Sequence, residues 1–265
     1  MSSGPRLDRL QSLGQSVRVT RVTGDTQLQS QVLESLAGAV RYRRWLADLA
    51  RPYLGQHPIE IGSGNGDYAQ EWISPARGRT SSPSSFTVTE ADAGRCAALA
   101  RRFSGHPIVR TQSLWLGHDS IGGSQHTAAV AFNVLEHIAD DVAAARAMGS
   151  LVRPGGAVVL LVPAFPSAMS TFDAAIGHYR RYTRKTLGRV VTEAGLTIDT
   201  IRYVNPIGLV GWYLTVKGLG LWPDDGWLVR LYDRVVVPVA RVADRTKVPF
   251  GQSVFAVARV PSVSR

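Results

Sequence analysis

The glycine-rich turn at residues 60–66, EIGSGNG, constrains the fold of this chain more than any other segment. A short apolar run near 58–61 leads into the turn and a helical segment follows it, so the sequence predicts a strand, a tight turn and a helix in succession. Glycine at alternate positions lets the backbone turn sharply and approach a ligand closely. Because the turn opens a helix, its free N–H groups favour an anionic group such as a carboxylate or a phosphate.

Strand and helix patterns alternate along the rest of the chain. Helices are expected over 33–54 and 93–103. Another is expected in the segment that follows residue 133, before a turn at 153–156, and a last one ends at about residue 194. Further strands are expected at 86–92, 107–114, 126–133, 157–163, 195–204 and 252–260. Such alternation predicts an α/β fold built on a doubly wound sheet.

The chain divides into four expected parts. With 265 residues, 45% of them hydrophobic, it is long enough for one large domain with a cap. Residues 1–32 are weakly patterned and are expected to form an N-terminal arm or helical cap. Residues 33–205 are expected to form the core, 206–249 an aromatic insertion that caps a pocket, and 250–265 a final core strand and tail.

The strand that follows the glycine turn ends in Glu90. A carboxylate at this position can accept hydrogen bonds from both hydroxyls of a ribose. The spacing G-x-G-x-G differs from the dinucleotide pattern G-x-G-x-x-G. Together these features predict a pocket for a nucleoside-bearing cofactor other than NAD.

Four segments in order, EIGSGNG, TEAD, FNVLEHIADD and LVRPGGAVVLLVP, resemble the motifs of class I S-adenosylmethionine (SAM)-dependent methyltransferases. The resemblance covers roughly residues 40–205. It implies a Rossmann-like, seven-stranded sheet whose last strand is antiparallel, SAM as cofactor and S-adenosylhomocysteine as product. The segment GHYRRYTRKTL also resembles a block found in bacterial methyltransferases associated with small molecules or glycolipids.

The resemblance assigns the cofactor contacts residue by residue. Glu90 and Ala91 would hold the ribose, while Asn133 and Val134 would border the sulfonium. Relatives place an Asp against the adenine where this chain has Gln112 and Ser113, so one of these two would serve. The methionine part would be surrounded by Glu60, Gly62, Ser63, Gly64 and Gly66.

Two histidines are candidate bases for the acceptor. Methyl transfer is an in-line displacement that needs an aligned acceptor, often with its proton removed by a base. His137 follows the fourth strand and His178 follows the fifth, so both are expected at the carboxyl-end rim of the sheet. The alternatives are a helix-capping role for His137 and a hydrogen bond from His178 to a carboxylate such as Asp173.

A metal site is a weaker interpretation of the same region. Asn133, Glu136, His137 and His178 offer oxygen and imidazole ligands. Ubiquinone-type and RNA 3′-end methyltransferases look similar but carry a Glu where this chain has Asn133. A neutral amide weakens a cation site, so no metal is expected.

The segment 177–186 and the aromatic insertion supply the candidate acceptor contacts. Arg180 and Arg181 are expected to clamp an anion, with surface decoration as the alternative. Tyr179 and Tyr182 offer aromatic faces and hydroxyls, and Tyr42, Trp212 and Tyr213 complete the set. The insertion has three alternatives to a pocket cap: ordinary core packing, a peripheral membrane surface and a dimer interface.

The predicted function is methyl transfer from SAM to a small-molecule or lipid-linked acceptor, apolar with an anionic group. The net charge of +10 suggests nucleic-acid methylation as an alternative, although no RNA-binding module is evident. The other alternative is a non-catalytic protein with the SAM-binding fold that acts as a partner subunit. The single cysteine, Cys96, excludes a disulfide within the chain, and the start lacks a signal-peptide pattern, so a cytoplasmic location is expected.

Overall fold

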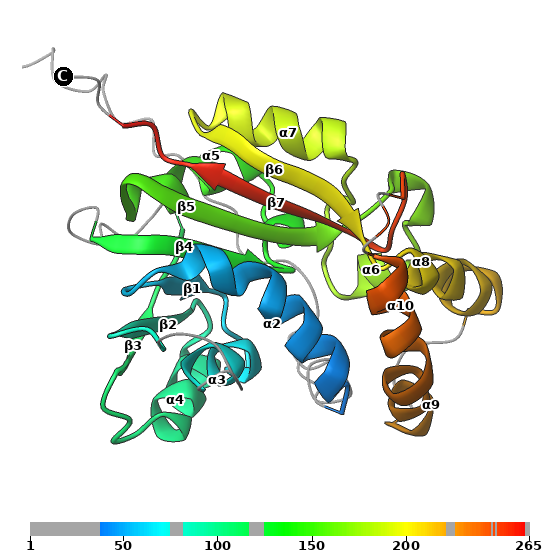
Figure 1. Ribbon diagram of the computed structural model, residues 1–265, viewed down its shortest axis with the longest axis horizontal. Helices are drawn as coiled ribbons and strands as arrows, with labels where there is room; N and C mark the ends of the chain where they lie inside the picture. The colour runs from blue at the N-terminus through cyan, green and yellow to red at the C-terminus, as the bar shows by residue number, and fades with distance from the viewer. Residues whose placement is uncertain are drawn as a thin grey trace, which may run out of the picture.

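A computed structural model describes residues 38–74, 82–116, 125–220, 226–244, 246 and 248–262. Within these residues the strands form one seven-stranded sheet in the order β3-β2-β1-β4-β5-β7-β6 (Figure 1). The strands are β1 (Ile59–Ile61), β2 (Phe86–Glu90), β3 (Val109–Ser113), β4 (His126–Phe132), β5 (Val152–Pro163), β6 (Thr197–Val204) and β7 (Ser253–Arg259).

Strand β7 is antiparallel to both of its neighbours, β5 and β6. The pairs of β1 with β2 and β4, of β2 with β3, and of β4 with β5 are all parallel. This confirms the predicted doubly wound, Rossmann-like sheet with an antiparallel last strand.

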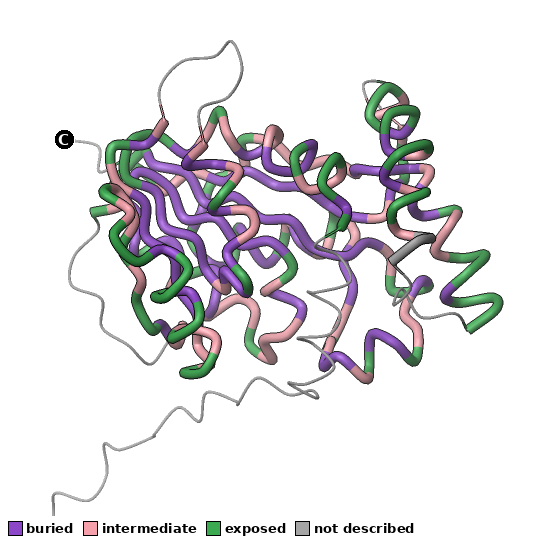
Figure 2. Tube along the Cα trace, turned by 90° about the horizontal axis from the view of Figure 1, so that it is seen from below, coloured by how far each residue is buried: buried purple, intermediate pink, exposed green. Residues whose placement is uncertain are grey.

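Helices cover both faces of the sheet. One face packs on α2 (Val40–Leu54), α3 (Asp67–Ile73) and α4 (Ala93–Arg102), and the other on α5 (Asp141–Ser150) and α7 (Arg184–Glu193). Side chains of β4 and β5 alternate between the two cores, as the two-residue period of a strand requires. Apart from residues 153–155 of β5, which are exposed, both strands are almost wholly buried, and Figure 2 shows this buried centre in purple.

Two local predictions need correction. The turn expected at 153–156 lies inside β5, where it forms an irregularity opposite the register shift between His126 and Ala128. Gly155 takes a positive φ of 78° there, and its N–H donates to Val260. The helix expected after residue 133 begins as a short 3₁₀ turn, η1 (Leu135–His137), and the α-helix starts only at Asp141, where Asp140 caps it.

Between β6 and β7 the chain forms a group of helices, here called the helical lobe (residues 206–243). It consists of α8 (Pro206–Trp212), α9 (Gly226–Leu231) and α10 (Val237–Ala243), with π-helical turns η3 (Tyr213–Gly218) and η4 (Tyr232–Val236). The lobe and the short helix α6 (Thr171–Ala175) lie beyond the ends of β5 and β6 (Figure 1). None of the described helices is long and apolar enough to cross a bilayer.

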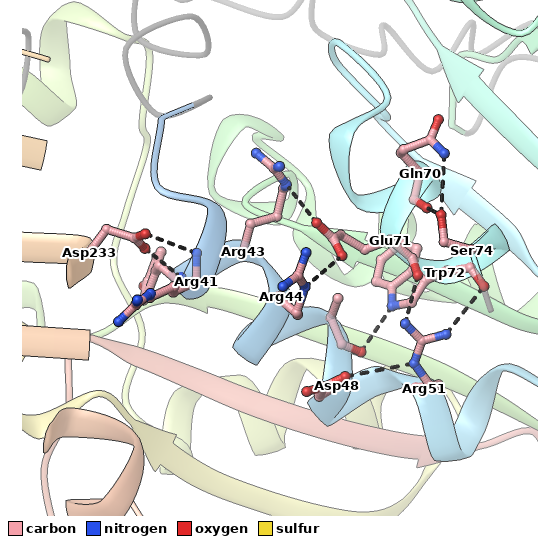
Figure 3. Close-up of polar contacts among 12 residues, drawn as sticks. Arg41, Arg43, Arg44, Asp48, Arg51, Gln70, Glu71, Trp72, Ser74 and Asp233 are labelled. Carbon is pink, nitrogen blue, oxygen red and sulfur yellow. Dashed lines mark hydrogen bonds and ion pairs between the residues drawn. The ribbon is translucent and has the colours of Figure 1, made fainter. Parts of the chain in front are cut away.

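A carboxylate of the lobe caps the start of α2. The Asp233 side chain accepts hydrogen bonds from the backbone N–H groups of Arg41 and Tyr42, at 3.0 and 2.7 Å. Figure 3 shows Asp233 facing Arg41, while Arg43 and Arg44 on the same helix point to Glu71 of α3. These contacts fix how η4 and α10 lie against the core. The arm expected over 1–32 is outside the described residues, and the predicted domain boundaries stay predictions.

Candidate active site

The glycine turn joins β1 to α3 and is bonded to the end of β2. The Ser63 N–H donates to the Thr89 carbonyl at 2.7 Å, and the Thr89 N–H donates back to the Ser63 hydroxyl at 3.1 Å. Gly62 has a φ of +65°, and a Cβ added there would meet Val134 Cγ2 at 2.8 Å. A side chain at this position is therefore excluded both by conformation and by contact.

Two buried carboxylates lie at this turn. Glu90 accepts the Gly64 N–H at 3.0 Å and the Ala91 N–H at 2.9 Å. Glu60 is only 3% exposed, and its Oε2 has no hydrogen-bond partner among the described residues. Burial raises the pKa of Glu60 to about 8. A buried carboxyl oxygen without a partner costs stability, which points to a ligand group that satisfies it.

The remaining predicted cofactor residues lie at the same end of the sheet. Ser113 pairs with Glu90 across β2 and β3. Asn133 follows β4 with a φ of +54°, a conformation that Asn tolerates better than most residues, and Val134 packs against the turn at Gly62. The structure thus brings the ends of β1, β2, β3 and β4 together, as a doubly wound sheet requires at its carboxyl edge.

Beside this edge, Glu136, His137 and His178 form a compact cluster. One potential ligand atom from each lies within 4.8 Å of the others. The His178 Nε2 lies 3.8 Å from Glu136 Oε1, and the two imidazole rings meet edge to face at 4.6 Å. The segment 177–186 is therefore folded back onto the turn after β4, helped by a hydrogen bond from the Tyr179 N–H to the Glu136 carbonyl.

Burial perturbs two members of the cluster in opposite directions. Burial raises the pKa of Glu136 to about 7, against the opposing effect of His178, and neither carboxyl oxygen has a hydrogen-bond partner in the described part of the chain. Burial, followed by the nearby His178, lowers the pKa of His137 to about 3. His137 is thus held neutral and is a weak base.

Asp173 holds the His178 ring in place. Its Oδ1 lies 2.8 Å from His178 Nδ1, which confirms the hydrogen bond considered as the alternative for this histidine. Arg181 donates to the same carboxylate through Nε at 2.8 Å, and Ser170 donates through its hydroxyl at 2.7 Å. Burial opposes ionisation of Asp173, but the hydrogen bonds from His178 and Arg181 outweigh it and lower the pKa to about 2.

Both arginines of the expected anion clamp have partners within the protein. Arg181 is buried, and its guanidinium stacks 4.3 Å from the Trp212 ring centroid. Arg180 forms an ion pair with Asp141 at 2.8 Å and donates to the Ala139 carbonyl. These contacts favour positioning roles for the pair, and acceptor binding by them stays a prediction.

The aromatic candidates are divided between two places. Trp212 donates to the Ala168 carbonyl and packs on Phe172, next to the Asp173 network. Tyr213 bonds Ser167 nearby. Tyr179 is partly exposed beside Arg180. Tyr42 packs against Trp45 and Tyr232, where burial raises its pKa, so the structure places it in the interface between α2 and the lobe.

The sequence indicated Asp173 only as a partner of His178; the bonds of Asp173 to Arg181 and Ser170, and the pairing of Tyr182 with Asp141, were not predicted. Tyr182 is buried, and its hydroxyl donates to Asp141 at 2.9 Å. The signal available for Asp173 was Ser170 three residues earlier, a capping-box pattern that the structure realises at the start of α6.

Comparisons with known proteins support this architecture. No curated protein matches the chain. Among solved structures, a methyltransferase in complex with the Haloferax volcanii activator Trm112 has a TM-score of 0.61 at 12% identity, over 90% of this chain and 99% of that one. Geranyl diphosphate methyltransferase with SAM reaches 0.55 at 15% identity, over 82% and 84%. The [4+2]-cyclase SpnF reaches 0.55 at 16% identity, over 83% and 81%.

At such low identity these structures establish the fold alone. The methyltransferase domain family model matches residues 37–201, which is more than half of the chain. The chain therefore belongs to the methyltransferase domain family and has the fold of the class I SAM-dependent methyltransferases.

Proposed function

We propose that the protein transfers a methyl group from SAM to a small-molecule or lipid-linked acceptor with a removable proton. One observation carries the proposal. The glycine turn with its two buried carboxylates adjoins the His178 imidazole, which is 9% exposed, is held by Asp173 and faces Glu136. The proposed cofactor site and the proposed proton acceptor would thereby be adjacent at one edge of the sheet.

The residues at the turn fit SAM. Glu60 Oε2, buried and without a partner among the described residues, can accept from the ammonium of the methionine part. Glu90 lies at the end of β2, where a carboxylate can accept from ribose hydroxyls, although it also accepts backbone N–H groups there. Bound SAM supplies an electrophilic methyl group on a sulfonium. Asn133 and Val134 are the proposed neighbours of that end.

His178 is the proposed base. Because Nδ1 faces a carboxylate whose pKa is low, the ring carries its proton on Nδ1 and presents the lone pair of Nε2. In the proposed transfer, the bond between the methyl carbon and the sulfonium sulfur would break as the acceptor atom bonds to that carbon, and S-adenosylhomocysteine would leave. The acceptor's proton would pass to Nε2 of His178, and Asp173 would stabilise the resulting imidazolium. Glu136, 3.8 Å from Nε2 with a pKa near 7, can take the proton onward. His137, with its lowered pKa, is a positioning residue.

The acceptor is proposed to contact Tyr179 and the aromatic side chains near Trp212. An anionic group on the acceptor was expected because Arg180 and Arg181 could bind it. Both guanidinium groups instead pair with Asp141 and Asp173, so this reason for an anionic acceptor no longer holds. An apolar acceptor with a hydroxyl, amine or acidic carbon is the proposal that remains.

A divalent cation bound by Glu136, His137 and His178 is the alternative. It is favoured by the two Glu136 carboxyl oxygens, which have no hydrogen-bond partner among the described residues. A cation there would bind Glu136, His137 and His178, would lower the pKa of an acceptor hydroxyl, and would leave neither imidazole free as a base. Dialysis against EDTA separates the two mechanisms. Turnover that survives supports the base, and turnover lost but restored by Mg²⁺ or Zn²⁺ supports the cation.

The direct test combines cofactor titration with one substitution. S-adenosylhomocysteine, titrated into stripped protein, should bind with Kd in the range of about 1 μM, near −8 kcal/mol. His178→Gln should lower turnover of a screened acceptor by about 100-fold or more while leaving this Kd within about twofold. His126→Gln, at the far end of β4, is the matched control. Folded protein that binds no cofactor would instead support a non-catalytic role, and salt-dependent RNA binding would support the nucleic-acid alternative.

A further inference from the structure

The most exposed apolar side chains gather on the helical lobe. Among the described residues, every large apolar side chain that is at least half exposed lies between positions 210 and 242. Elsewhere in the described chain, the exposed ones, Val40, Tyr179 and Phe250, reach only 39%. Scattered apolar residues on a surface need no explanation, but a concentration on one substructure marks a contact site.

In the second half of the lobe these side chains form one stripe. Leu231, Val235, Val239 and Val242 are spaced by four, four and three residues, which places them on one face of the continuous segment from α9 to α10. They are between 50% and 61% exposed. The opposite face is buried against the core through residues Asp233, Val237 and Ala240. The stripe is therefore turned outward by contacts that hold the helix.

The first half of the lobe adds a second apolar edge. Val210 and Leu214 lie one turn apart and are 52% and 64% exposed, and Leu219 beyond them is 71% exposed. Leu209 and Val216 on the other side are buried. Both halves thus show an inner face packed on the protein and an outer face of aliphatic side chains.

In the described part of the lobe the exposed charges are of one sign, although one of them, Arg241, forms an ion pair with Asp48 of α2 at 3.0 Å. Among the described residues of the lobe, every exposed charged side chain is a cation, namely Lys217, Arg230, Arg234 and Arg241. The described acid of the lobe, Asp233, is buried and accepts backbone N–H groups of α2. Arg230 and Arg234 lie one turn apart, each next in sequence to a residue of the apolar stripe.

We propose that the outer face of the helical lobe docks on a membrane surface that contains anionic lipids. Aliphatic side chains would enter the boundary between headgroups and acyl chains, and the cations would contact lipid phosphates. An amphipathic segment with basic residues on its polar side matches this surface in both chemistry and charge, and the net charge of +10 acts in the same sense.

The proposed docking face adjoins the candidate active site. Trp212 of α8 stacks on Arg181, which holds the Asp173 carboxylate beside His178. Docking through the lobe would place the proposed acceptor site close to the bilayer surface, which suits a lipid-linked acceptor. Membrane binding itself requires no methyl transfer, so its test is independent of the proposed function.

The test is sedimentation of the full chain with lipid vesicles. We expect binding to vesicles that mix phosphatidylglycerol with phosphatidylcholine, at least about tenfold weaker binding to phosphatidylcholine alone, and weakening as salt rises from about 0.1 M to about 0.5 M. Val235→Glu with Val239→Glu should lower binding by at least about tenfold, because two carboxylates would enter the interface. Arg230→Gln with Arg234→Gln should remove much of the preference for the anionic lipid.

The matched control is Ala97→Glu with Ala100→Glu on α4. These residues are also exposed, and the change in net charge is the same. Circular dichroism and thermal unfolding establish that each variant is folded. The proposal is overturned if the Val235/Val239 variant binds anionic vesicles as the control does. It is also overturned if the wild type ignores vesicles but forms a dimer that this variant splits, since the face would then be an interface between two copies.

Discussion

The buried pair of Asp173 and Arg181 offers the sharpest test of the site's architecture. Both side chains are at most 3% exposed, and the Asp173 carboxylate also receives hydrogen bonds from His178 and Ser170. Asp173→Asn keeps the shape of the side chain but leaves the Arg181 charge buried without its counterion. Breaking a buried pair in this way costs about 3–5 kcal/mol of the free energy of unfolding.

The pKa of Asp173 gives a second estimate of the same interaction. A pKa lowered from 3.8 to about 2 corresponds to roughly 2 kcal/mol in favour of the ionised form in the folded protein. Since folding lowers this pKa, the stabilisation is fully present above the unfolded-state value and is lost as the pH falls toward 2. The difference in stability between wild type and Asp173→Asn should therefore be full at pH 7 and shrink below about pH 4.

Urea denaturation at pH 7, followed by circular dichroism, measures the change, and the melting temperature should fall by about 6–20 °C. The control is Asp199→Asn, which breaks the pair between Asp199 and Arg259, both 41% exposed. That loss should stay below about 1 kcal/mol. Equal, small losses in both variants would show that the Asp173 network does not hold the segment 170–182 in place.

Three further perturbations address the cofactor turn and the cluster. Gly62→Ala should lower the melting temperature more than Gly105→Ala does. Both glycines have a positive φ, but only a Cβ at position 62 would meet a neighbour, Val134. Equal losses would show that the contact with Val134 adds nothing to the cost of the substitution. Glu90→Gln should weaken S-adenosylhomocysteine binding by about tenfold in calorimetry, and an unchanged Kd would remove Glu90 from the ribose site. The free energy of unfolding of Glu136→Gln should rise relative to that of the wild type as the pH increases from about 4.5 to about 7. Burial raises the pKa of Glu136, so its ionisation over this range destabilises the folded wild type. A difference in unfolding free energy that stays constant across this range would contradict the prediction.

Most of the fold could be predicted because each element carries a local signal. The apolar run of β5 and the glycine turn after β1 specify a buried strand and a strand–helix junction directly from sequence. The residues at 153–156 were predicted as a turn because Pro and Gly favour turns. Their place within β5 depends on Val260, which donates to Gly156 and accepts from Gly155 more than a hundred residues later in the chain.

The candidate site could be predicted in composition but not in pairing. The expected meeting of His137 and His178 follows from parallel strands ending at one edge, and their rings are in contact. The partners of Arg180 and Arg181 could not be read, because the segment 177–183 is irregular and has no periodicity that assigns a direction to each side chain. Two adjacent arginines look the same in the sequence whether they bind a ligand or form ion pairs within the protein.

The helical lobe leaves the sheet and returns to it at a single point. Val204, the last residue of β6, pairs with Ser253, the first of β7, and the neighbouring Asn205 and Gln252 bond through both backbone and side chains. The helical lobe is therefore one insertion between two neighbouring strands, and its two ends are held together by the contacts of Asn205 with Gln252. A different group of helices joined to these two residues could keep the register of β6 and β7, but it would also have to replace the contacts that Asp233 makes with α2 and that Trp212 makes with Arg181.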